Sequence, residues 1–263
     1  VTLSRTNLPA DLATRLAGYT ATPVTTGESG GSVHRLSAPG RPSCFLKLGR
    51  EAVADDITHE MLRLTWLDGK LPAPQVLHFV RDDDHAALLS TALPGVAAAE
   101  WLAEHPDRAA EALRSIADFL RRLHALPVEH CPFEAGHGLR LAAARQRLDA
   151  GLVDEEDFDE ARAGMSAHAV WSDMQGMLPL PFERVVTHGD FSLDNIFLDD
   201  GRVTGCLDVG RLGVADPYQD VAILWNNLSE FGDKLQETWL SAYGVTPPDT
   251  ARLAFHCCLD EFF

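Results

Sequence analysis

The 263-residue sequence has no uninterrupted apolar stretch that approaches the roughly 18 to 20 residues needed to cross a bilayer. Residues 1–5 also lack the apolar region of a signal peptide. The five cysteines are odd in number, and none are spaced as CxxC, so neither a disulfide framework nor a zinc site is expected. We therefore expect a soluble protein that stays in a reducing cytoplasm.

Basic residues are scarce, with 22 Lys and Arg against 39 Asp and Glu, which gives a formal net charge of −17. Such an acidic excess repels phosphate backbones and anionic lipid, so nucleic acid and membrane surfaces are poor partners. It suits a cationic ligand, although the alternative is that the charge only keeps the protein soluble. The 46% hydrophobic content is enough for a sizeable core in one large domain or two lobes.

The first 92 residues are rich in predicted strands. Strands are expected over residues 33–36 and 43–48, on either side of a turn at Gly40, and a second pair over 75–80 and 86–90. Apolar spacing predicts a helix over 55–66, with Asp55 or Asp56 as its N-cap. Pro94 and Gly95 then interrupt the pattern. We place a domain boundary here.

Residues 93–263 are predicted to be mainly helical. Helices are expected over 106–126, 139–150, 216–228, 234–243 and 250–263, and Asp216 is the expected N-cap of the third of these. One hairpin interrupts them, with strands over 196–198 and 203–207 around Asp200 and Gly201. The sequence thus predicts an α+β fold with a small β-rich N-terminal lobe, 1–92, and a larger helical C-terminal lobe, 93–263.

The segment from His188 to Asn195 carries the clearest chemical signal. A kinase catalytic loop needs a carboxylate that orients the substrate hydroxyl and, five residues later, an Asn whose oxygen reaches Mg²⁺. Asp190 and Asn195 have this spacing, and Asp208 follows after the predicted hairpin, where a kinase carries its second Mg²⁺ ligand. Each residue alone is typical of a turn or strand end, but the ordered set favours phosphoryl transfer from a nucleotide.

The N-terminal part supplies residues that could hold the nucleotide. Lys47, near the end of the second strand, can reach phosphates, and Glu60 on the following helix can pair with it. The glycine cluster lies before the first strand, 33–36. It includes Ser29 and Gly30, which we expect to contact the phosphates. The segment 27–31 also matches G-x-S-x-G, the nucleophile elbow of hydrolases, but strand-like residues follow Ser29 where that motif needs a helix.

These motifs resemble the aminoglycoside 3′-phosphotransferases, the kanamycin and neomycin kinases. The resemblance covers nearly the whole chain. It rests on His188-Gly189-Asp190 with Asn195, on Asp208, on the stretch 210–216 and on the acidic, Phe-ended terminus. It implies a two-lobed protein-kinase-like fold, ATP with Mg²⁺ as cofactors, GTP as an alternative donor, and resistance through phosphorylation of the antibiotic's 3′-hydroxyl.

The resemblance also implies residue roles. Asp190 corresponds to the catalytic Asp, Asn195 and Asp208 to the Mg²⁺ ligands, and Lys47 with Glu60 to the nucleotide-positioning pair. Thr91 and Leu93 lie where the hinge backbone meets adenine. The antibiotic-binding residues would be Asp157, Asp159, Glu160, Arg211, Asp260, Glu261 and the terminal carboxylate of Phe263. Asn226 and Asn227 stand where relatives carry a charged residue.

The acidic run itself fits a polycationic antibiotic, since six of the seven residues 154–160 are Asp or Glu and no compensating basic run accompanies them. The alternative is a solvated, mildly disordered charge run. Other small-molecule kinases, acting on macrolides, homoserine or choline, are the nearest rivals, although choline would require an aromatic cage. A protein kinase is disfavoured because no Ala-Pro-Glu follows Asp208. A catalytically silent nucleotide-binding module is disfavoured by the intact residue set.

Overall fold

The computed structural model describes residues 10–24 and 31–263. The predicted phosphate contacts at Ser29 and Gly30 lie outside these residues. The chain divides into two compact units, the first formed by residues 1–95 with Thr204–Gly210 and the second by Val96–Val203 with Arg211–Phe263. The expected boundary between residues 92 and 93 stays a prediction. The assignment of nucleotide binding to the first lobe, and of catalysis and antibiotic binding to the second, also stays a prediction.

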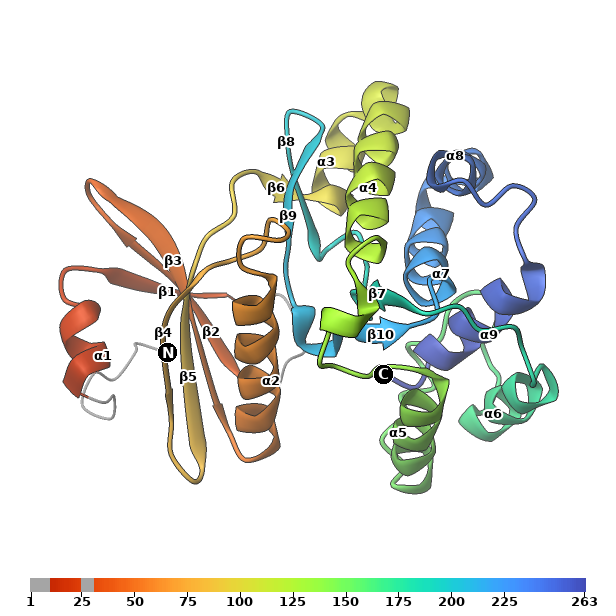
Figure 1. The fold of residues 1–263 in the computed structure, drawn as a ribbon, viewed down its shortest axis with the longest axis horizontal. Coiled ribbons are helices and arrows are strands. Elements are labelled where there is room, and N and C mark those ends of the chain that lie inside the picture. Colours follow the sequence, from red (N-terminus) through yellow and green to blue (C-terminus); the bar gives the residue numbers. More distant parts are fainter. Residues whose placement is uncertain (1–9, 25–30) are drawn as a thin grey trace. The chain divides into compact units, whose positions relative to one another are not determined.

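The first unit is built on a five-stranded antiparallel sheet with strand order β1-β2-β3-β5-β4 (Figure 1). Side chains alternate between the two faces of a strand. On β3, Cys44 and Leu46 therefore pack with Leu12 and Leu16 of the N-terminal segment, while Lys47 lies on the opposite face. The elements are α1 (Ala10–Arg15), β1 (Thr20–Val24), β2 (Ser32–Ala38), β3 (Arg41–Arg50), α2 (Ala52–Leu67), β4 (Val76–Arg81) and β5 (His85–Thr91).

Helix α2 packs on the face of the sheet that carries Lys47. Its contact residues Ile57, Glu60, Leu64 and Leu67 recur on one side of the helix and are buried. The predicted helix is confirmed, but its predicted N-cap was wrong. The helix begins one turn before the two aspartates, after Glu51, whose φ is 52° and whose side chain makes no cap hydrogen bond. The chain reverses at Glu51, where the backbone N–H donates to Asp84 O at 2.9 Å, so the first turn forms earlier.

The second unit is mainly helical, and its longest described helix lies within the predicted range 106–126, with Leu113, Ile116, Leu120 and Leu123 fully buried as a stripe along one side. Its helices are α3 (Ala98–Glu104), α4 (Ala109–His124), α5 (His137–Asp149), α6 (Ala167–Gly176), α7 (Tyr218–Asn227), α8 (Asp233–Tyr243) and α9 (Thr250–Asp260). Helix α8 ends at Gly244 in the left-handed conformation, as expected, whereas α9 ends three residues before the predicted limit.

Short strands bracket the segment from His188 to Asn195. Strand β7 (Val185–Thr187) precedes it and pairs with β10 (Gly213–Ala215). Strands β8 (Ile196–Asp199) and β9 (Arg202–Cys206) follow it and form the predicted hairpin, with positive φ at both Asp200 and Gly201. Strand β6 (Val96–Ala97) pairs with β8. The strands β6, β7 and β10 are too short to leave a periodic signal in the sequence.

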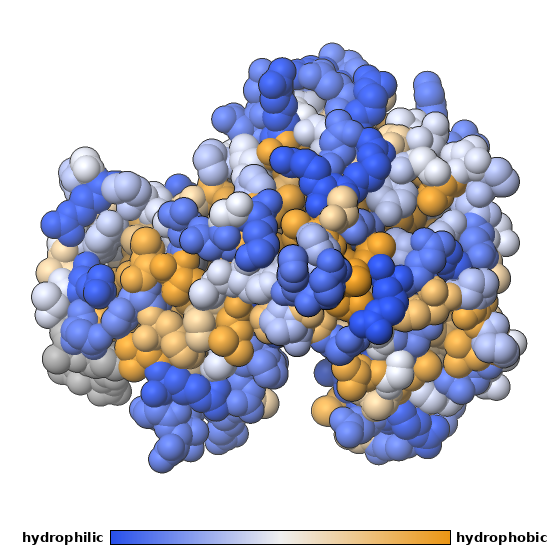
Figure 2. All heavy atoms as spheres, in the orientation of Figure 1, coloured by the Kyte–Doolittle hydropathy of each residue, from blue (hydrophilic) through white to orange (hydrophobic). Residues whose placement is uncertain are grey.

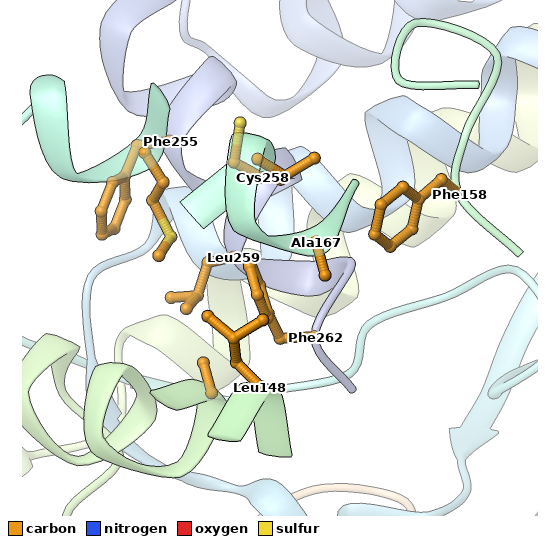
Figure 3. Packing of buried hydrophobic residues seen from close by; sticks show 10 residues of the cluster. Leu148, Phe158, Ala167, Phe255, Cys258, Leu259 and Phe262 are labelled. Carbon is orange, nitrogen blue, oxygen red and sulfur yellow. The ribbon is translucent and has the colours of Figure 1, made fainter. Parts of the chain in front are cut away.

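A separate hydrophobic cluster joins α5, α6 and α9 (Figure 3). Phe158 of the acidic run belongs to this cluster, as do Leu148 and Leu259, and it is 8% exposed. A ring buried in this way fixes the run to the helices behind it. The acidic run is therefore anchored at Phe158, while most of its carboxylates are exposed to solvent.

The surface of each unit mixes hydrophilic and hydrophobic residues, as the visible face in Figure 2 shows. The large apolar side chains that are exposed come from different elements, and Leu139, Leu152 and Phe182 are examples. Among the described residues, no helix has the length and apolarity required of a membrane span.

Candidate active site

The loop between β7 and β8 holds Asp190 in a fixed conformation. The Asn195 side-chain nitrogen donates to the backbone oxygen of Asp190 at 3.0 Å and to its carboxylate Oδ2 at 3.2 Å. Beneath it, the fully buried ring of Phe191 packs edge to face with His188. Within the described residues, no hydrogen bond or ion pair engages the other carboxylate oxygen, Oδ1. Asp190 thus has one anchored oxygen and one that can accept a proton or hydrogen bond.

The backbone of the loop is fixed by Asp220 on helix α7, a residue the sequence interpretation did not assign. Its two oxygens accept the N–H groups of His188 and Gly189, both at 2.8 Å, and the carboxylate is fully buried. The Nε2 atom of His124 lies 2.9 Å from Asp220, and its Nδ1 lies 2.7 Å from the Tyr243 hydroxyl. A buried carboxylate is stable when its oxygens are hydrogen-bonded in this way.

Gly189 explains why the loop needs glycine before its aspartate. Its φ is +88°, and a Cβ atom here would lie 2.4 Å from the backbone oxygen of Arg211. Its carbonyl accepts hydrogen bonds from Arg140 at 2.8 Å and Gln219 at 3.2 Å. Only glycine tolerates both the left-handed backbone and the close approach.

Asn227, noted in the sequence as a departure from relatives, also supports the loop. Its side-chain oxygen accepts the backbone N–H of Leu193 at 3.0 Å. The residue thus contributes to the conformation of the loop between Asp190 and Asn195.

In the first unit, Lys47 meets two carboxylates. Its ammonium group lies 2.8 and 2.9 Å from the two oxygens of Glu60 and also contacts Asp208. Burial by itself would lower the pKa of Lys47, but the charges of Glu60 and Asp208 outweigh it and raise that pKa. Burial raises the pKa of Glu60, although Lys47 opposes this change. The predicted pairing of Lys47 with Glu60 is present, and Lys47 stays a cation.

Asp208 provides an exposed carboxylate on a turn of unusual conformation, since its φ is 50°. The described residues contain no group of three or more His, Cys, Asp or Glu side chains that could hold a metal ion. Magnesium is usually held by one or two carboxylates together with substrate phosphates, so an all-protein cage is not required. Asp208 offers carboxylate oxygens and Asn195 an amide oxygen, and both are ligands of the kind that fits Mg²⁺. The Asn195 nitrogen donates to Asp190, which leaves the Asn195 oxygen for a cation.

The backbone at the end of β5 bears on the residues assigned to adenine. The Thr91 N–H already donates to Gln75 O at 3.0 Å, and the Thr91 hydroxyl accepts from Gln75 N at 2.9 Å. The next N–H, that of Ala92, donates to Ser43 O. Within residues 10–24 and 31–263, no hydrogen bond engages the Leu93 backbone. The Leu93 N–H is thus left for a nucleobase edge among the described residues, and the assignment of Thr91 and Leu93 to adenine stays a prediction.

The acidic loop has partners that the sequence interpretation overlooked. Asp157 and Glu160 are exposed and form no ion pair in the described part of the chain. Asp159 is half-buried and, with Glu261, binds Arg162, which lies 3.2 Å from Glu261. The sequence contains no compensating basic run, but one cation, Arg162, lies two residues beyond the acidic run and folds back onto it.

The shared cation does not fully neutralise Glu261. Burial and the nearby charge of Asp159 raise the pKa of Glu261 to about 7, against the opposing effect of Arg162. The folded protein therefore holds this proton more tightly than the unfolded chain, whose Glu has an ordinary value of 4.5. The unfolding free energy must then fall as pH rises from about 4.5 to about 7, with the full loss present above that range.

Glu261→Gln should remove this dependence. We expect the denaturant midpoint of the wild type to fall more steeply between pH 5 and about 7 than that of the variant, because Gln carries no proton to lose. Urea denaturation at several pH values measures the difference. Glu160→Gln, an exposed change in the same loop, is the control and should follow the wild type. Parallel profiles for wild type and Glu261→Gln would contradict the assignment.

The last residues of the chain contact the loop between β7 and β8 through arginines. Asp260 lies 3.5 Å from Arg140, and burial raises the pKa of Asp260 although Arg140 lowers it. The guanidinium groups of Arg140 and Arg211 lie 4.4 and 5.3 Å from the ring centre of Phe263. Arg211 is exposed and lies 3.9 Å from Asp190 Oδ2. Among the residues predicted for the antibiotic, Arg211, Asp260 and Phe263 thus lie together.

Comparison with known proteins agrees with this geometry. Residues 20–256 match the model of the phosphotransferase enzyme family. The chain belongs to that family. It is 48% identical to an aminoglycoside 3′-phosphotransferase of Escherichia coli, over 99% of this chain and 96% of the relative. The resemblance seen in the sequence is confirmed, as is activity of the phosphotransferase class toward a hydroxyl group.

Solved structures confirm the protein-kinase-like fold. A crystal structure of an aminoglycoside 3′-phosphotransferase of type VIII superposes with a TM-score of 0.84 and 32% identity, covering 96% of this chain and 97% of that one. An aminoglycoside phosphotransferase of Streptomyces rimosus, solved with ADP and streptomycin, gives 0.79 and 28% identity, with 95% of each chain covered. That relative binds both a nucleotide and an aminoglycoside.

Proposed function

We propose that this chain transfers the γ-phosphoryl group of ATP to the 3′-hydroxyl of an aminoglycoside antibiotic and so confers resistance. The observation that carries the proposal is the state of Asp190. One of its oxygens is held by Asn195, and its other oxygen has no partner in the described residues. The relatives at 44% to 48% identity are named aminoglycoside 3′-phosphotransferases, which supports the acceptor class.

Each residue has a distinct task in this proposal. Phosphoryl transfer passes through a loose transition state, so the protein mainly positions reactants and stabilises charge. The free oxygen of Asp190 accepts the hydrogen bond of the antibiotic hydroxyl, orients it and takes its proton late. Lys47, held extended by Glu60, binds phosphate oxygens. Asn195 and Asp208 would hold Mg²⁺, which when bound offsets negative charge on the phosphates.

The exposed carboxylates of the acidic loop would attract the antibiotic. Aminoglycosides carry several ammonium groups, and Asp157 and Glu160 offer negative charge that no residue of the described chain neutralises. Such clusters raise the local concentration of a polycation and orient it more than they strengthen its final binding. Glu261 and Asp260 already serve Arg162 and Arg140, so we assign them a smaller share of the direct contact.

A substrate panel tests the function. Purified protein with MgATP is given kanamycin, a 3′-deoxy analogue of it, streptomycin, or no antibiotic, and ADP release is followed with the product mass. We expect release with kanamycin and a mass increase of one phosphoryl group, and none above background with the 3′-deoxy compound. Equal turnover of the 3′-deoxy compound would refute the site of transfer, and no stimulation by any aminoglycoside would refute the acceptor class.

Lys47→Ala tests the nucleotide half of the proposal. A hydrogen bond to a charged group contributes about 1.5 to 3 kcal/mol, so the KM for MgATP should rise by roughly 10- to 100-fold. The KM for kanamycin should stay within about twofold, since Lys47 is assigned no contact with the antibiotic. Steady-state kinetics with each substrate varied in turn measure both values.

Lys70→Ala is the matched control for that variant, because Lys70 belongs to the same unit and its ammonium lies over Trp66. It should leave both KM values unchanged. If Lys47→Ala behaved like Lys70→Ala, the phosphate-binding role of Lys47 would be wrong.

A further inference from the structure

Arg140 is a buried cation on helix α5 that contacts the backbone of the catalytic loop. It is 8% exposed, and its Nη1 donates to the carbonyl oxygen of Gly189 at 2.8 Å. That carbonyl belongs to the peptide unit that continues directly into Asp190. The orientation of this peptide sets the direction in which the Asp190 side chain leaves the backbone.

Burial of Arg140 is unfavourable for the guanidinium. Burial lowers the pKa of Arg140 to about 10, with only partial compensation from Asp260, and its Nε has no hydrogen-bond partner among the described residues. An apolar residue of similar volume often replaces a buried ion pair without loss of stability. The contact of Arg140 with Gly189 therefore points to a task other than stabilising the fold.

The other contacts of Arg140 lead to the end of the chain. Asp260 lies 3.5 Å from it, and the ring of Phe263 lies 4.4 Å from the guanidinium carbon. The same ring lies 5.3 Å from Arg211, whose Nη1 is 3.9 Å from the carboxylate of Asp190. Two cations that contact one ring thus reach the loop at neighbouring points, the carbonyl of Gly189 and the side chain of Asp190.

We propose that Arg140 is a positioning residue for phosphoryl transfer. It positions Asp190 by joining Asp260 and Phe263 to the peptide unit that leads into Asp190. The inference rests on the proposed function, because it takes Asp190 to be the group that orients the hydroxyl. It assigns to the chain end a task beyond antibiotic contact. Substitutions there should lower kcat and not only raise KM, because a small displacement of reacting groups is enough to slow a positioned reaction.

Arg140→Gln is the first test, with Arg145→Gln as its control. Arg145 lies on the same helix, is exposed and pairs with Asp149. We expect Arg140→Gln to lower kcat for kanamycin by at least about tenfold, with the KM for MgATP within about twofold. Arg140→Lys should recover part of the loss, because an ammonium can donate to Gly189 but lacks the planar group that stacks on Phe263. Arg145→Gln should match the wild type.

Hydrogen exchange gives a readout that does not depend on turnover. Exchange of the backbone amides in the peptide 186–195 should be at least about fivefold faster in Arg140→Gln than in wild type, because loop opening no longer breaks a contact with Arg140. Arg145→Gln should leave this peptide unchanged. Phe263→Leu, which keeps an apolar side chain but no ring, should lower kcat by about threefold and leave the fold intact.

These measurements separate the two proposals. If wild type turns over no aminoglycoside, the proposed function fails, and the exchange rates still decide whether Arg140 holds the loop. If wild type is active but Arg140→Gln keeps more than half of kcat with unchanged exchange, Arg140 has no positioning role. Should Arg140→Gln fail to fold, Arg140→Lys and Phe263→Leu decide, and wild-type kcat and exchange in both would overturn the inference.

Discussion

Asp190→Ala is expected to lower kcat for kanamycin by about 100-fold or more while leaving the affinity for ATP nearly unchanged. A positioned general base contributes about 10²- to 10⁴-fold, and its interaction with the hydroxyl strengthens in the transition state. Asp190→Asn should lose as much, since the amide keeps the shape and a contact with Asn195 but cannot accept the proton. Steady-state kinetics and nucleotide titration measure the two effects.

Asp194→Ala is the control for this prediction. Asp194 lies in the same loop, is exposed and makes no ion pair in the part of the chain that the structure describes. It should keep wild-type turnover. Asp190→Ala with more than half of wild-type kcat would remove Asp190 from the reaction, and the proposed mechanism would fail with it.

Asp216→Ala is expected to destabilise the protein by about 3 to 5 kcal/mol, the usual effect of leaving a buried charge unpaired. Asp216 is fully buried, and both of its oxygens lie within 2.7 Å of Arg252 Nη2. It also accepts the backbone N–H groups of Tyr218 and Glu183. Without it, the buried Arg252 would keep only the exposed Glu183 as an ion-pair partner among the described residues.

The midpoint of urea denaturation measures the loss, with Asp173→Ala as the control. Asp173 is exposed on α6 and forms no ion pair within the described residues. The double variant Asp216→Leu with Arg252→Met should recover part of the stability, because it removes the whole pair. Similar midpoints for Asp216→Ala and Asp173→Ala would show that the pair is not what stabilises the helices it joins.

Much of the architecture could be predicted because its signals are local. The stripe on α4, the turn at Asp200 and Gly201, and the end of α8 at Gly244 each follow from a short pattern of residues. The spacing of Asp190 and Asn195 likewise indicated that these two residues act together, and the Asn195 side chain donates to Asp190. These are places where local preference and tertiary structure agree.

The residues that support the site could not be found in this way, because their partners are distant in the chain. Asp220 is separated from Gly189 by 31 residues, and Arg140 by 49. Nothing in the residues around Arg140 marks it as buried, since arginine on an amphipathic helix is usually exposed. The cation that binds Asp159 was missed for a related reason, since its second partner, Glu261, lies 99 residues further along.

Phe158 has a consequence for how antibiotic range can change during evolution. The buried Phe158 ring and the contacts of Asp159 with Arg162 and Glu261 secure the loop, so the exposed carboxylates of Asp157 and Glu160 make few demands on the packing. Asp157 and Glu160 could be exchanged for other side chains one at a time while the enzyme stays folded and its reaction centre intact. If these carboxylates attract the antibiotic as proposed, selection by a new drug would act on recognition alone, and variants with an altered substrate range should carry changes at these two positions and retain Phe158.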